Sequence, residues 1–122
     1  MEVSSAMVRK PDEMEREVRE RMRGGNGAVE ISHVFREDEL GGGARLFARL
    51  RLPAGASIGF HRHEGEAEVF YILSGRGLVD DDGTKREVTA GDAVLTGGGA
   101  GHAIEALGDE PLEMIAVILT YR

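Results

Sequence analysis

With 122 residues, 41% of them hydrophobic, the chain is long enough to bury one core but not two, so we expect a single globular unit. The formal net charge of -7 argues against nucleic acid or an anionic membrane surface as a partner, because like charges repel. No apolar run reaches the roughly 20 residues that span a bilayer, and the N-terminal segment lacks the apolar middle of a signal peptide. We therefore expect a cytoplasmic protein. Because the chain has no cysteine, any metal must be bound by histidine and carboxylate.

The first predicted element is an amphipathic helix over Pro11–Arg23. Met14, Val18 and Met22 are spaced four apart and form a narrow apolar stripe on an otherwise charged segment. The glycine pair that follows is a typical helix end. We assign residues 1–28 to an N-terminal extension that carries this helix, and we expect the helix to lie on the outside of the domain.

From residue 29 to 122 the pattern changes to short runs of valine, isoleucine, leucine and phenylalanine separated by glycine. Such runs are typical of an all-β sandwich or barrel. We expect strands at 29–35, 44–52, 57–63, 67–73, 76–81, 85–89, 93–96, 102–107 and 111–120.

Several glycine-containing segments predict turns rather than ligand sites. Asp82 and Gly83 lie between two strand-like runs and fit a type I′ hairpin, so the acidic triplet 80–82 is interpreted as a turn and not as a calcium site. The glycine-rich stretches 41–43 and 97–101 are not followed by a Lys-Ser/Thr pair or a helix start. We therefore expect tight loops there and no phosphate site.

The candidate metal ligands are His61, His63, Glu68 and His102. Residues i and i+2 of a strand point to the same face, so the first two imidazoles should lie side by side. A turn before Glu68 can return its carboxylate to the same point, and His102 begins another strand. Three neutral imidazoles and one carboxylate suit one divalent ion per chain, either Mn, Fe, Co, Ni, Cu or Zn. His33 is interpreted as an ordinary strand histidine.

The residues around His61, His63 and Glu68 form a motif that resembles the first of the two sequence motifs of the cupin family. Gly55, His61, His63, Glu68 and Gly75 occupy every fixed position of the first cupin motif, G-x5-H-x-H-x4-E-x6-G. This match carries all but one of the four candidate ligands.

The second cupin motif, G-x5-P-x-G-x2-H-x3-N, is matched in part. Gly91, Gly99 and His102 agree with it, and 15 residues separate the two motifs, as in small microbial cupins. Gly97 replaces the motif's proline and Ala106 its asparagine, which removes a rigid loop residue and a local turn hydrogen bond.

The resemblance to cupins implies an all-β, double-stranded β-helix (jelly-roll) barrel over residues 29–122, with its metal inside one end. Cupins are usually dimers or larger. We expect a homodimer here because Val69, Tyr71 and Leu73 point outward from a strand whose inner face carries Glu68. The family includes dioxygenases, oxalate decarboxylases, sugar-phosphate isomerases, lyases, cyclases and non-catalytic binding proteins, so fold alone does not decide the reaction.

Strand alternation predicts an apolar wall around the ligands. Phe70 and Ile72 follow Glu68 on its face, and Ile104 follows His102. These three are the predicted pocket-lining residues.

Charged side chains are expected to contribute little to this wall. Arg45, Arg49 and Arg51 alternate with core residues and predict a solvated strand face; only the inverted register would turn an arginine toward an anionic substrate. Glu105 should point away from the ligands, and Glu66 should lie in the turn at the mouth.

Four protein ligands leave two positions open on an octahedral ion, and one carboxylate leaves a divalent ion with net positive charge. A small bidentate anion, an enolate or O₂ could bind there. With few acids or bases in the wall, we favour oxygenation or decarboxylation at the metal over an isomerase that moves protons. A non-catalytic small-molecule binding or sensor protein is the alternative.

Overall fold

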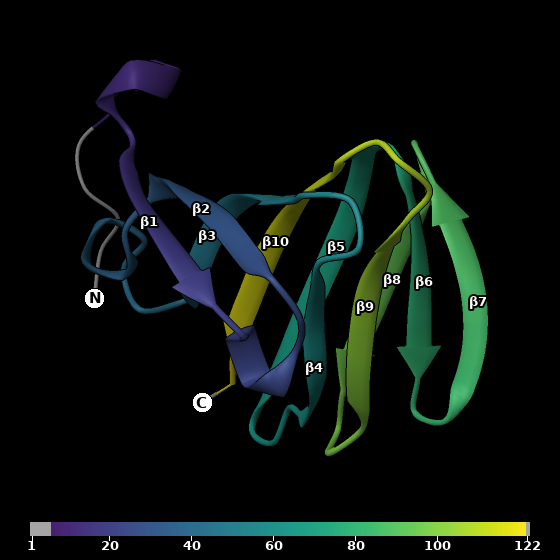
Figure 1. Ribbon diagram of the computed structural model, residues 1–122. Helices are drawn as coiled ribbons and strands as arrows, with labels where there is room; N and C mark the ends of the chain where they lie inside the picture. The colour runs from purple at the N-terminus through teal and green to yellow at the C-terminus, as the bar shows by residue number, and fades with distance from the viewer. Residues whose placement is uncertain (1–5, 122) are drawn as a thin grey trace.

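The computed structural model describes residues 6–121, which form two antiparallel sheets facing each other (Figure 1). The six-stranded sheet has the order β1-β2-β3-β10-β5-β8, and the four-stranded sheet has the order β4-β9-β6-β7. The strands are β1 (Glu15–Glu20), β2 (Ala28–Phe35), β3 (Ala44–Leu52), β4 (Ser57–Arg62), β5 (Glu66–Ser74), β6 (Arg76–Asp81), β7 (Thr84–Thr89), β8 (Ala93–Gly97), β9 (Gly101–Leu107) and β10 (Leu112–Thr120).

The nine strands expected from residue 29 onward are confirmed, with ends that differ by at most one residue. β3 shows why they were predictable. Ala48, Leu50 and Leu52 are buried, whereas the arginines between them are exposed, which is the expected register. The jelly-roll class predicted from the sequence is therefore correct.

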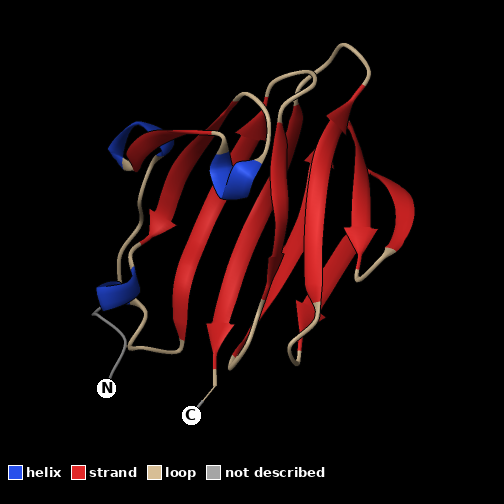
Figure 2. Cartoon of the chain, turned by 60° about the horizontal axis from the view of Figure 1, so that its bottom comes forward, coloured by secondary structure: helices blue, strands red, loops and turns tan. Residues whose placement is uncertain are grey.

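The predicted N-terminal helix is wrong. The segment forms a 3-10 turn, η1 (Pro11–Glu13), then the strand β1, then a second 3-10 turn, η2 (Met22–Gly24). The one further helical piece within residues 6–121 is the 3-10 turn η3 (Glu37–Glu39), so no described helix is long and apolar enough to span a bilayer (Figure 2).

The physical reason is the free edge of β2. β1 pairs with β2 along its whole length and satisfies backbone groups that a helix could not reach. Val18, the centre of the supposed apolar stripe, remains 63% exposed. A stripe of three residues buries too little area to outweigh that pairing.

The hydrophobic core lies between the two sheets. The six-stranded sheet contributes Phe70, Ile72 and Met114, and the four-stranded sheet contributes Ile58 and Ile104; each of these is at most 2% exposed. This packing fixes the strands whose ends carry the candidate ligands.

The hairpin predicted between β6 and β7 is confirmed. Asp82 and Gly83 both have positive φ, 49° and 101°, as a type I′ turn requires. The Gly83 amide donates to the Asp80 carboxylate at 2.7 Å, so this acidic group is used in the turn.

Candidate metal centre

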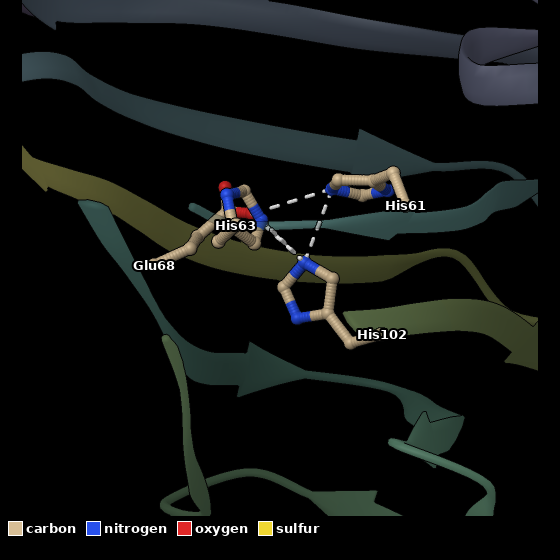
Figure 3. A group of neighbouring side chains, drawn as sticks. All are labelled: His61, His63, Glu68 and His102. Carbon is tan, nitrogen blue, oxygen red and sulfur yellow. Dashed lines mark hydrogen bonds and ion pairs between the residues drawn. The ribbon is translucent and has the colours of Figure 1, made fainter. Parts of the chain in front are cut away.

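Four side chains from three strands and one loop converge inside the barrel (Figure 3). His61 lies on β4, His63 directly follows it, Glu68 lies on β5 and His102 on β9. His102 Nε2 is 3.0 Å from His63 Nε2, 3.2 Å from His61 Nε2 and 2.9 Å from Glu68 Oε1. Glu68 Oε1 is also 2.9 Å from His63 Nε2. The structure thus brings the four predicted ligand side chains together.

These spacings fit a metal ion. Donors adjacent on an octahedral ion with bonds of about 2.1 Å are about 3.0 Å apart. The contacts of 2.9–3.2 Å agree with that value, whereas His61 Nε2 to Glu68 Oε1, at 3.7 Å, is wider. Electron-rich atoms at this distance repel one another unless a cation, a proton or a metal ion, lies between them.

The outer nitrogens of two imidazoles are anchored so that their Nε2 atoms face the cluster. His61 Nδ1 is 2.8 Å from the carbonyl oxygen of Gly59. A carbonyl can only accept, so Nδ1 carries the hydrogen. His102 Nδ1 is 2.9 Å from Thr96 Oγ1, and both residues are buried. Metal-binding histidines are commonly oriented by a hydrogen bond of this kind.

The third imidazole, His63, differs. Its Nδ1 is buried and makes no hydrogen bond to any described residue; Glu66 Oε1 is 3.4 Å away. A carboxylate at this distance needs only a small shift to accept from Nδ1. All three imidazoles are therefore placed to use Nε2 as the ligand atom.

Burial and charge set the protonation states of the cluster. Burial raises the pKa of Glu68, but the hydrogen bond with His102, the contact with His61 and the neighbouring imidazole charges outweigh it and lower the pKa to about 2. Burial lowers the pKa of His63, partly opposed by the charge of Glu68. At neutral pH the carboxylate is ionised and His63 is neutral, the forms that bind a metal.

A cavity of about 130 Å³ opens beside the cluster. Phe70 lines it and stacks on the His102 ring, with centroids 4.8 Å apart and planes at 11°. Ile72 and Ile104 are buried in the core and do not line this cavity. His33, interpreted from the sequence as an ordinary strand residue, does line it, and its Nε2 is 2.7 Å from Glu17 Oε2.

The N-terminal segment adds cavity residues that sequence reasoning missed. Arg19, Met22 and Arg23 line the cavity, together with Arg45 at the start of β3. The mistaken helix had placed the first three outside the domain. The one signal for them in the sequence is the mostly charged run Glu15–Glu20, which fits a polar edge strand as well as a helix.

Glu66 and Glu105, which were expected to contribute little to the wall around the ligands, do not line this cavity. Glu66 is the first residue of β5 and accepts two hydrogen bonds from Arg45, at 2.6 and 3.0 Å. Glu105 lines a separate surface hollow that also contains Lys85. Neither faces the cavity beside the cluster.

The comparison with protein families agrees with this geometry, because a model of the cupin domain matches residues 48–118. The chain belongs to the cupin family. A cupin of Thermotoga maritima named "Oxalate-binding protein" is 43% identical over 119 residues, which cover 98% of each chain. A solved structure described as a predicted oxalate decarboxylase from Thermotoga maritima has a TM-score of 0.90 and 44% identity, over 93% of this chain and 99% of the other. KdgF from a Halomonas species has a TM-score of 0.74 but 18% identity, over 94% of each chain, so it supports the fold alone.

Proposed function

We propose that this cupin binds one divalent first-row transition metal through His61, His63, Glu68 and His102, and that the loaded site binds a small dicarboxylate of the oxalate type. The observation that carries the proposal is the convergence of three Nε2 atoms and one carboxylate oxygen. The metal would supply positive charge and open coordination positions for carboxylate oxygens.

The size and lining of the cavity support a small anionic ligand. A volume of about 130 Å³ fits a ligand of a few heavy atoms. Arg23 contributes a positive charge to its lining, beside Arg19 and Arg45, which are paired with carboxylates, and Phe70 contributes an apolar wall. The name of the Thermotoga maritima relative, "Oxalate-binding protein", points to the same ligand class.

Binding is the primary proposal, and turnover at the metal is the second. Among the described residues that line the cavity, Glu68 is the one carboxylate, and it is a proposed ligand. His33 is paired with Glu17. Such a wall does not favour a sugar isomerase, which needs free groups to move protons. Decarboxylation or oxygenation depends more on the metal, and the solved relative described as a predicted oxalate decarboxylase directs attention to the first of these.

Calorimetry tests the binding proposal. Oxalate should bind protein loaded with Mn²⁺, and removing the metal should weaken binding at least about tenfold. Equal affinity with and without metal would contradict it. Assays of the loaded protein for CO₂ release from oxalate and for O₂ consumption, with several metals, then separate an enzyme from a binding protein.

We also propose that the protein is a homodimer. Tyr71 is 48% exposed and Leu95 is 70% exposed, on neighbouring strands of the six-stranded sheet. Val69 is the cross-strand partner of Leu95 and shares this outer face, so this part of the sheet surface is apolar. A second copy covering this face would remove that area from water. Light scattering at micromolar concentration should give twice the chain mass, and a monomer mass would refute the proposal.

A further inference from the structure

The η2 turn is attached tightly to β4, the strand that carries His61 (Figure 1). The Asn26 amide donates to Ser57 Oγ, and the Ser57 amide donates to the Asn26 carbonyl oxygen, both at 2.9 Å. A Cβ at Gly25 would lie 2.1 Å from the Ser57 carbonyl oxygen, and one at Gly59 would lie 2.1 Å from that of Arg23. The two backbones thus touch where only glycine fits, and this contact fixes the turn at the cavity.

Three arginines line the cavity, but two of them already face a carboxylate. Arg45 forms a double hydrogen bond with Glu66, and Arg19 Nε is 2.5 Å from Glu17 Oε1. Arg23, in η2, forms no ion pair or side-chain hydrogen bond with any described residue. Its charge is therefore available to a ligand.

The charges around the cavity favour a ligand with two negative charges over a ligand with one. A divalent metal and ionised Glu68 together carry +1, and the free guanidinium of Arg23 adds +1. The sum of +2 matches a dicarboxylate, whereas a monocarboxylate would leave one positive charge unmatched. A guanidinium also binds a carboxylate through two parallel N–H donors.

We propose that Arg23 is the residue that selects dicarboxylates: one carboxylate of the anion binds at the metal, and the other accepts hydrogen bonds from Arg23. This inference rests on the proposed metal-dependent binding of small anions. The N-terminal segment is thus part of the ligand site, because its η2 turn carries the guanidinium that binds the second carboxylate.

Arg21 provides a matched control for Arg23. It belongs to the same turn, has the same left-handed backbone (φ 51° against 54°) and is exposed, but it does not line the cavity. Arg21→Gln and Arg23→Gln change the net charge equally. An Arg23→Gly variant also removes the guanidinium while relieving the left-handed backbone.

The experiment is calorimetry of Mn²⁺-loaded protein with oxalate and with acetate. Arg23→Gln should weaken oxalate binding about tenfold but acetate binding by less than about threefold. Arg21→Gln should weaken the binding of either anion by less than about twofold. Arg23→Gly should lose oxalate affinity like Arg23→Gln, with a melting temperature within a few degrees of the parent. Mn²⁺ should bind Arg23→Gln as tightly as the parent or tighter, because a positive charge near the ion is removed.

The outcomes separate this inference from the function on which it rests. Parent protein that binds oxalate, with Arg23→Gln no weaker than Arg21→Gln, would overturn the role of Arg23 and leave the metal proposal standing. Loss of Mn²⁺ affinity together with oxalate affinity in Arg23→Gln would show a merely structural role and would also overturn it. Failure of loaded parent protein to bind oxalate would refute both.

Discussion

Replacing Thr96 with valine should weaken metal binding while hardly changing the metal-free protein. Valine has the shape of threonine but no oxygen to accept the hydrogen bond from His102 Nδ1. When Nε2 binds a metal, Nδ1 must carry the hydrogen. In the metal-free protein His102 can instead move that hydrogen to Nε2, which lies 2.9 Å from Glu68 Oε1. The missing acceptor therefore penalises mainly the loaded state.

The magnitude follows from burial. Thr96 is 2% exposed and His102 is 0% exposed, so water cannot replace the lost acceptor. Leaving a buried donor without a partner costs about 1–3 kcal/mol, which corresponds to about a 5- to 150-fold loss of metal affinity. Competition with a chelating dye measures that loss, and thermal unfolding measures the metal-free stability. Thr89→Val, on an exposed strand position, is the control and should leave both unchanged. Metal affinity of Thr96→Val equal to that of the parent would refute the anchoring role.

Three other changes have outcomes set by the structure. Glu68→Gln should reduce metal affinity, but the loaded fraction should bind oxalate at least as tightly as the parent, because a negative charge is removed beside the metal. His61→Gln should reduce metal affinity without any gain in oxalate affinity, because the ligand charge is unchanged. Calorimetry on both variants, with the metal content of each sample measured, tests the contrast. Gly25→Ala should lower the free energy of unfolding by about 2 kcal/mol in urea, because its Cβ would lie 2.1 Å from a backbone oxygen. Hydrogen bonds from the Arg9 side chain and the Arg36 amide lower the pKa of Glu39 from 4.5 to about 2. The stabilising contribution of ionised Glu39 is therefore complete above pH 4.5 and disappears toward pH 2. In urea unfolding, Arg9→Gln should destabilise the protein more at pH 6 than at pH 3.

Two controls belong to these measurements. Gly43→Ala should be nearly neutral, since the nearest atom to its Cβ, the Leu40 carbonyl oxygen, lies 3.8 Å away. Arg49→Gln removes an exposed ion pair with Glu113 and should change stability little at either pH. A Gly25→Ala protein as stable as Gly43→Ala, or an Arg9→Gln effect that does not depend on pH, would contradict the corresponding prediction.

The strands from residue 29 onward and the pairing of His61 with His63 could be predicted because both depend on local spacing. His102 is distant in the sequence, and the resemblance to the second cupin motif assigned it to the same cluster. Alternation of apolar and polar residues places Ala48 and Leu50 in the core and Arg49 outside, and this pattern can be recognised from neighbouring residues alone. The His61 and His63 pair uses the same period of two. The structure adds which ring nitrogens face the cluster, because their partners, such as Thr96, are distant in the sequence.

The N-terminal segment could not be predicted in this way. β1 is an edge strand with polar residues on both faces, so it carries no alternation of apolar residues, while the spacing of Met14, Val18 and Met22 is compatible with a helix. Its conformation is decided by pairing with β2 and by contacts such as that of Glu17 with His33. The place of Arg23 in the cavity depends on that long-range pairing and was missed with it.

The most direct test of the metal centre is anomalous X-ray diffraction from crystals of protein saturated with Mn²⁺ or Co²⁺. We expect one anomalous peak per chain, between the Nε2 atoms of His61, His63 and His102 and the Glu68 carboxylate, with ligand distances of about 2.0–2.2 Å. Crystals in which these four side chains keep their positions around no metal, or in which the peak lies elsewhere, would contradict the account.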